Sequence, residues 1–277
     1  MSTFPADFWG RIAYLVQNYS ESFLRGAGVT IVIAVVSTIL GCLIGFAVGI
    51  VQTVPTDRSD NKVKWFFMGI VKFILNAYVE LFRGTPMMAQ AVFIYFGAAQ
   101  LYGIHMNMWQ VAIFVVSINT GAYMAETVRG GILSIDAGQT EGAKAIGMTH
   151  VQTMLHVILP QAFRNIIPQI GNNLIINIKD TCVLSVIGVV ELFFTTKGVA
   201  GAYYTYFEAF TIALVIYFVM TFTCSRILRR IETKLDGDDN YDLATTDTLT
   251  HTSGLYKYKE NPHKMTNQNL DIREGGR

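Results

Sequence analysis

Long apolar runs, most of them uncharged, alternate with short polar segments along this chain of 277 residues. The first run, residues 28–51, would extend about 36 Å as a helix, which exceeds the roughly 30 Å hydrocarbon core of a bilayer. Further apolar runs cover residues 106–125, 165–188 and 209–224. Because a bilayer core offers no water to backbone groups, such runs are typical of membrane-spanning helices. The pattern predicts an all-α integral membrane protein.

Residues 65–102 are too long for one straight crossing, because a helix of that length would extend about 57 Å. The first half carries three charged residues, Lys72, Glu80 and Arg83. Residues 84–86 read Gly-Thr-Pro, which favours a kink or an unwound turn. We predict one span over residues 70–100, broken at 84–86. Two spans are the alternative, and the three charges argue against it. The total is five spans.

The two ends of the chain differ from the spans in composition. Apolar residues recur at steps of three and four over residues 5–25, which predicts an amphipathic helix in the membrane interface as a first unit, 1–26. Residues 233–277 are polar, with scattered charges, and are predicted to be a disordered cytoplasmic tail. The membrane domain between them is predicted at 27–232.

Lys and Arg residues set the predicted orientation. One side of the membrane receives most of them: Arg58, Lys62, Lys64, Arg129, Lys144, Arg226, Arg229, Arg230 and Lys234. The other side receives Arg11, Arg25 and Lys197. This asymmetry predicts an N-out, C-in topology, and it places the polar segment at 136–160 in the cytoplasm.

Composition excludes some functions. The chain is 52% apolar and 15% charged with a net charge of +1, which gives no support to nucleic-acid binding. Its three cysteines lie far apart and form no ligand pattern, so no metal site is expected. It lacks the G-x-x-x-x-G-K-[ST] phosphate loop, so it is not expected to hydrolyse ATP alone.

The polar segment at 136–160 predicts two short helices with a bend between them. Asp136 with Gln139, and Thr149 with Gln152, have capping-box spacing, and Gly147 lies between the two helices. Pro160 is expected to end the second helix. The segment is either a docking element or an ordinary solvated loop. In the docking interpretation, Gly142 and Ala143 admit a partner's backbone and Glu141 accepts from its Arg or Lys.

The same segment resembles the EAA motif of ABC-importer permease subunits. The matching residues are Glu141, Gly142, Ala143, Gly147, Val157, Leu159 and Pro160, with Gly142 and Val157 departing from the motif. Three further stretches are similar to the polar amino acid branch: ELFRGTP at 80–86, AYMAETVRGGI at 122–132 and KDTCV at 179–183, whose last two positions depart. The resemblance covers about residues 20–232.

The resemblance implies a five-helix type I importer permease in the cytoplasmic (inner) membrane, translocating a polar amino acid by alternating access. It implies a second permease subunit, either a copy of this chain or a paralogue, and an extracytoplasmic substrate-binding protein. It also implies a separate ATPase subunit that docks on the coupling segment and binds ATP and Mg²⁺. No cofactor is expected in this chain.

Polar side chains inside the spans are candidates for the substrate pathway, since each is costly to place in lipid. Asp180 could face a substrate ammonium group, or it could pair with Lys179, Arg164 or Glu126. Thr85 and Gln90, beside the expected break, could present polar groups to a carboxylate or simply belong to the kink. Asn119, and likewise Thr120, Asn172, Asn173 and Asn177, are as well suited to interhelical hydrogen bonds.

Glu126 and Arg129, one turn apart, are interpreted as a structural ion pair. An alternative function is an ion-coupled secondary amino acid transporter, with Lys179, Asp180 and the broken second span forming its site. The cytoplasmic segment at 136–160 distinguishes the two hypotheses, because an ion-coupled carrier has no need of it.

Overall fold

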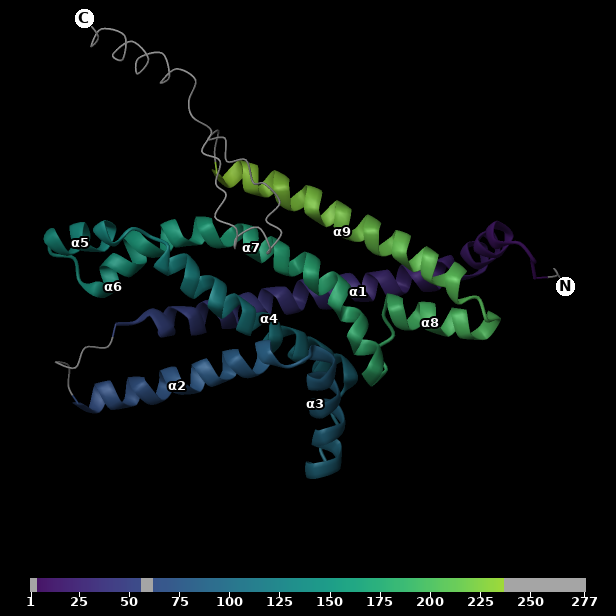
Figure 1. Ribbon diagram of the computed structural model, residues 1–277, viewed down its shortest axis with the longest axis horizontal. Coiled ribbons are helices and arrows are strands. Elements are labelled where there is room, and N and C mark those ends of the chain that lie inside the picture. Colours follow the sequence, from purple (N-terminus) through teal and green to yellow (C-terminus); the bar gives the residue numbers. More distant parts are fainter. Residues whose placement is uncertain (1–3, 56–61, 237–277) are drawn as a thin grey trace, which may run out of the picture. The chain divides into compact units, whose positions relative to one another are not determined.

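The computed structural model describes residues 4–55 and 62–236, and these residues are helical with no strand among them (Figure 1). The helices, in chain order, are α1 (Phe8–Thr53), α2 (Lys62–Gly84), α3 (Met87–Tyr102), α4 (Met108–Leu133), α5 (Ala137–Ala145), α6 (His150–Thr153), a π-helical turn (Met154–Ile158), α7 (Leu159–Asp180), a 3-10 turn (Thr181–Ile187), α8 (Leu192–Tyr203) and α9 (Tyr206–Asp236). Arg58 and the predicted tail from residue 237 onward lie outside the described residues.

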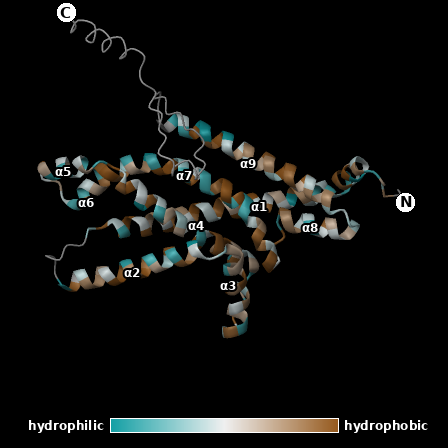
Figure 2. Cartoon of the chain, viewed as in Figure 1, coloured by the Kyte–Doolittle hydropathy of each residue, from teal (hydrophilic) through white to brown (hydrophobic). Residues whose placement is uncertain are grey.

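Four described helices are long and apolar enough to cross a membrane: α1, α2 from Trp65, α4 and α9 up to Lys234. A fifth crossing results if the bent pair His150–Ile187 and Leu192–Tyr203, which meet at 56°, counts as one span. In Figure 2, α9 is hydrophobic along much of its length and turns hydrophilic toward its C-terminal end. The predicted all-α membrane fold is confirmed.

The predicted boundary at residue 26 is absent, because one continuous helix, α1, runs from Phe8 to Thr53. No proline interrupts this stretch, and Gly26 is held by packing against the backbone of Leu192, where a Cβ would come within 2.9 Å of Leu192 Cα. Residues 8–25 are helical, as their periodicity predicts, but the predicted end of this helix at residue 26 is wrong. The interfacial position of residues 1–26 stays a prediction.

The second span also differs from its prediction. The break at 84–86 is confirmed, but the crossing helix is α2, and α3 is a separate helix of 16 residues that turns sharply away from it (Figure 1). Pro86 cannot donate to the ladder and disfavours helical geometry at Thr85, so the two halves need not share an axis. Instead, α3 packs through Ala91 against Val111 and Ile187.

Helix α1 packs closely against α4, and glycines make this approach possible. Gly41, Gly45 and Gly49 lie on one face of α1, four residues apart. A Cβ at these positions would come within 2.7, 2.3 and 2.7 Å of α4 side-chain atoms. Small residues at this spacing let membrane helices approach backbone to backbone. The sequence interpretation missed this pattern, although GCLIGFAVG displays it.

A buried polar contact joins three helices beside this seam. Asn177 of α7 donates from Nδ2 to Thr38 Oγ1 of α1 at 2.8 Å and to Thr120 Oγ1 of α4 at 3.0 Å. All three side chains are buried. Of the two uses considered for Asn177, the structure shows the interhelical hydrogen bonds.

A second buried polar residue, Glu191, begins α8. Its carboxylate accepts from the backbone N–H groups of Phe193 at 2.8 Å and Phe194 at 2.7 Å, and from Tyr217 Oη at 3.0 Å. A carboxylate at a helix N-terminus satisfies orphan N–H groups and opposes the positive end of the helix dipole. Glu191 therefore fixes the start of α8 and links it to α9.

Candidate functional site

The coupling segment begins at Asp136, whose Oδ1 accepts from the backbone N–H of Gly138 at 2.7 Å at the start of α5. The predicted capping box between Asp136 and Gln139 does not form, because the N–H of Gln139 donates to the backbone carbonyl of Asp136 at 3.0 Å rather than to its side chain. Gln139 Oε1 accepts instead from Gln161 Nε2 of α7 at 3.3 Å, so its side chain is drawn away from the cap. This contact ties α5 to α7.

The bend after α5 is built around Gly147, which has a φ of +86°. The N–H of Gly147 donates to Lys144 O at 2.9 Å, and the N–H of Met148 donates to Ala143 O at 3.1 Å. These two bonds form a Schellman motif, which requires a left-handed residue that glycine adopts without strain. The bend predicted from Gly147 is confirmed.

The second helix begins with the predicted capping box. Gln152 N donates to Thr149 Oγ1 at 3.3 Å, and Thr149 N donates to Gln152 Oε1 at 2.8 Å. Pro160, however, does not end this helix, because α7 starts at Leu159 and continues through it. The turn before it, Met154–Ile158, is a π-helix, and a wider turn relieves the clash of a proline ring with the preceding carbonyl.

The predicted docking residues lie mostly at the surface of this segment. Glu141, Gly142, Gly147 and Pro160 are exposed, Leu159 is half-buried and Ala143 is buried. Among the described residues, Glu141 has no ion-pair partner within 4.0 Å. Its carboxylate is therefore available to a partner, as the docking interpretation requires.

Three apolar side chains extend this surface, and the sequence interpretation missed them. Ile146 is 80% exposed, Val151 63% and Leu155 55%. Ile146 also lines a small hollow, together with Gly147, Met148, Gln152 and His156. We call Ile146, Val151, Leu155 and the hollow the coupling surface. Apolar side chains exposed together on a polar segment mark an interaction site. Their occurrence within an otherwise polar stretch of the sequence could have predicted this surface.

Three of the four pathway candidates meet at the break between α2 and α3. Gln90 Nε2 donates to Thr85 Oγ1 at 2.8 Å and to the carbonyls of Phe82 and Thr85, each at 3.0 Å. Asn119 Nδ2 of α4 donates to Phe82 O at 2.9 Å and to Gln90 Oε1 at 3.2 Å. These bonds satisfy carbonyls that the end of α2 would otherwise leave without a donor.

Asp180, the fourth candidate, lies elsewhere, at the exposed end of α7. In the described part of the chain it forms no ion pair within 4.0 Å, so none of the partners considered for it is engaged.

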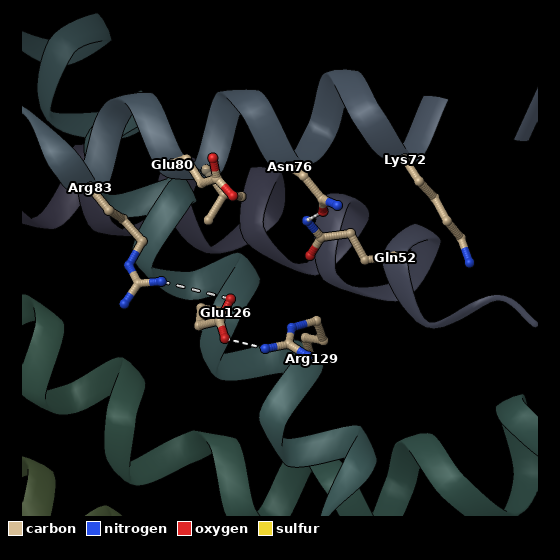
Figure 3. A pocket seen from close by; sticks show the side chains of 8 residues that line it. Gln52, Lys72, Asn76, Glu80, Arg83, Glu126 and Arg129 are labelled. Atoms are coloured by element: carbon tan, nitrogen blue, oxygen red, sulfur yellow. Dashed lines mark hydrogen bonds and ion pairs between the residues drawn. The ribbon is translucent and has the colours of Figure 1, made fainter. Parts of the chain in front are cut away.

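The predicted pair of Glu126 with Arg129 is confirmed, and Arg83 of α2 adds a second contact, Nη1 to Glu126 Oε2 at 3.7 Å (Figure 3). No group of His, Cys, Asp or Glu among the described residues is arranged to hold a metal ion.

Comparison with known proteins identifies the family. Residues 65–237 match the family described as binding-protein-dependent transport system inner membrane component. The chain belongs to this family. The permease is also 35% identical over 216 residues to the arginine transport system permease protein ArtQ of Bacillus subtilis, covering 78% of this chain and 93% of that protein. It is 33% identical over 213 residues to the glutamine transport system permease protein GlnP of Escherichia coli K12, covering 76% and 92%.

A solved structure agrees with this assignment. The permease superposes with a TM-score of 0.71 and 32% identity on a chain from the crystal structure of an amino acid ABC transporter with histidines, covering 83% of the permease and 99% of that chain. The permease is thus a membrane-spanning transport subunit of an ABC importer in the inner membrane, rather than an enzyme. Importers of this family work with an ATPase and a substrate-binding protein. The comparisons lend no support to the ion-coupled alternative.

Proposed function

We propose that the permease serves an importer of polar amino acids and that a separate ATPase subunit docks on its coupling surface. The observation that carries the docking proposal is a set of exposed apolar side chains, Ile146, Val151 and Leu155, on a segment whose Glu141 carboxylate forms no ion pair with any described residue. Relatives named as arginine and glutamine permeases support the substrate class. ATP and Mg²⁺ are bound by the partner ATPase, and this chain carries no cofactor.

The remaining partners follow from the same proposal. A second permease subunit, a copy of this chain or a paralogue, completes the pathway, and an extracytoplasmic binding protein delivers the amino acid. The N-out, C-in orientation places the coupling surface on the ATPase side of the membrane. Thr85, Gln90, Asn119 and Asp180 stay predicted pathway residues, and the first three also hold the end of α2.

The coupling surface is tested by purifying the permease with its co-expressed subunits and reconstituting them in proteoliposomes. We expect Gly147→Pro to lower ATP-driven amino acid uptake at least tenfold, because proline cannot adopt a φ of +86° or donate to Lys144 O. We expect Glu141→Lys to act similarly by reversing the charge offered to the ATPase. Membrane insertion, measured by yield in the membrane fraction, should stay at the wild-type level.

Glu21→Lys is the matched control, because Glu21 is an exposed carboxylate of α1 whose reversal leaves the coupling segment untouched. It should transport like the wild type. Normal uptake by both coupling-segment variants would refute the docking assignment. Uptake that continues without ATP and stops when ion gradients are collapsed would refute the ABC-importer proposal itself.

A further inference from the structure

Helix α9 carries three arginines directly after its apolar run. Residues 209–225 contain no charged side chain and would extend about 25 Å as a helix, close to the roughly 30 Å hydrocarbon core of a bilayer. Arg226, Arg229 and Arg230, which we call the arginine trio, follow at once. Figure 2 shows the same change, because α9 turns from hydrophobic to hydrophilic toward its C-terminal end. This length places the trio at the level of the lipid headgroups.

The trio shares one face of α9 with exposed apolar side chains. Steps of three and four residues align it with Phe218 and Phe222 along the helix. Phe218 is 63% exposed, Phe222 is 47% exposed, and all three arginines are exposed. The opposite face packs inside the protein, since a Cβ on Gly171 of α7 would come within 3.2 Å of Leu228 Cδ1. An exposed apolar stripe therefore leads into three exposed cations.

The trio has no carboxylate partner in the part of the chain that the structure describes. None of the three guanidinium groups lies within 4.0 Å of a described carboxylate, although Glu232 follows within one turn. The guanidinium carbon of Arg226 lies over the ring of Phe222, 4.9 Å from its centroid, within the range of a cation–π contact. Elsewhere the chain pairs its arginines with carboxylates, as at Arg11, Arg25, Arg83 and Arg129.

A phosphodiester with an acyl chain fits both parts of this face. Guanidinium groups bind phosphate oxygens in bidentate geometry, and cations near a membrane surface attract anionic headgroups. The exposed phenylalanines offer apolar contact one and two turns deeper in the membrane. A soluble phosphate would use the arginines and leave this stripe unused.

We propose that the arginine trio binds the headgroup of an anionic phospholipid whose acyl chain lies along Phe222 and Phe218. This lipid site goes beyond the proposed function and involves neither the coupling surface nor the predicted pathway residues. It requires only that α9 crosses the membrane, as its length and composition allow. In the proposed N-out, C-in orientation, the site lies in the cytoplasmic leaflet.

The test is native mass spectrometry of the permease purified with its co-expressed subunits, because each bound lipid then appears as a separate mass. The delipidated complex is titrated with dioleoylphosphatidylglycerol or with dioleoylphosphatidylcholine, which has the same acyl chains and no net charge. Glycerol 1-phosphate, which has the phosphate and no acyl chain, is the third probe. The wild type should bind the first phosphatidylglycerol at least tenfold more tightly than either other probe. Higher ammonium acetate concentration should reduce this preference, since salt screens the attraction.

The decisive variant is Arg226→Gln/Arg229→Gln/Arg230→Gln. At roughly fivefold in affinity for each cation near a lipid surface, it should weaken binding of the first phosphatidylglycerol by up to about 100-fold and lose the preference over phosphatidylcholine. Because the trio is exposed and unpaired among the described residues, the variant should keep the wild-type melting temperature. The matched control removes three exposed cations from α1, α2 and α8 and should bind like the wild type: Arg25→Gln/Lys62→Gln/Lys197→Gln.

A single position tests the guanidinium itself. Arg226→Lys keeps the positive charge but loses the planar group that lies over Phe222. It should weaken phosphatidylglycerol binding, though less than Arg226→Gln does. Equal weakening by the two variants would contradict a role for the charge of Arg226, and wild-type binding by both would remove Arg226 from the site.

Three results would overturn the lipid site: no preference of the wild type for phosphatidylglycerol, displacement of phosphatidylglycerol by equimolar glycerol 1-phosphate, or equal loss of preference in the two triple variants. The second would indicate a site for soluble phosphate, and the third an effect of net charge alone. An unchanged preference with loss of a permease subunit from the complex in the trio variant would show instead that a second permease covers this face. None of these measurements involves transport, so failure of the lipid site leaves the proposed function standing.

Discussion

The seam between α1 and α4 predicts a large effect from one added methyl group, in Gly45→Ala. The new Cβ would lie 2.3 Å from Met124 Cβ and 2.8 Å from the Met124 carbonyl carbon. Carbon atoms in contact are normally about 3.5–4.0 Å apart, so the helices must separate by more than about 1 Å. Overpacking of this kind costs about 1–3 kcal/mol. We place Gly45→Ala near 3 kcal/mol, since separation also loosens the contacts at Gly41 and Gly49.

The matched control is Gly28→Ala on the same helix, where a Cβ meets no atom within 4 Å. It removes a glycine from a helix interior, which favours the helix by about 1 kcal/mol. Any difference between the two variants therefore reports on the seam rather than on glycine replacement.

The assay is the apparent melting temperature of detergent-purified permease, followed by fluorescence-detected size exclusion at one heating time, since membrane proteins unfold irreversibly. At roughly 2–4 °C per kcal/mol, Gly45→Ala should melt about 6–12 °C below the wild type. Gly28→Ala should melt at or slightly above the wild type. If the two variants melt within about 2 °C of each other, the close approach of α1 and α4 is not what holds the bundle together.

The same assay checks two polar contacts. Gln90→Leu leaves the Thr85 carbonyl without its side-chain donor and should destabilise the permease by about 1–3 kcal/mol, and an unchanged melting temperature would contradict the capping role. Glu191→Ala removes the acceptor for two N–H groups at the start of α8 and should cost up to about 2 kcal/mol. Glu191→Gln, which keeps one acceptor oxygen, should cost less, and equal losses for the two variants would contradict the cap.

The sequence predicted the elements that depend on local chemistry. An uncharged run long enough to cross the bilayer identified α1 and α4, because lipid imposes that length on any spanning helix. Pro86 identified the end of α2, because it removes a donor and disfavours helical geometry before it. Gly147 and the capping box at Thr149 identified the bent coupling segment for similar local reasons.

The errors concern features that depend on neighbours in space. The end of the amphipathic N-terminal stretch was misplaced because nothing local decides whether it continues into the first span. Pro160 was expected to stop a helix, and a π-turn accommodates it instead. The direction of α3 is set by its packing on α4 and the 3-10 turn, and the contact of Arg83 with Glu126 joins residues 43 apart. No periodicity in the sequence encodes either one.

The α1–α4 seam and the α2–α4 contact between Arg83 and Glu126 differ in kind. Along the seam, buried glycine backbone meets buried side chains, so a small change of volume strains the whole bundle. At the α2–α4 contact, Arg83 and Glu126 are 41% and 36% exposed and 3.7 Å apart, and a pair of that exposure contributes about 1 kcal/mol or less. Arg83→Ala should therefore melt within about 4 °C of the wild type. Melting of Arg83→Ala at as low a temperature as Gly45→Ala would contradict this contrast between the two contacts.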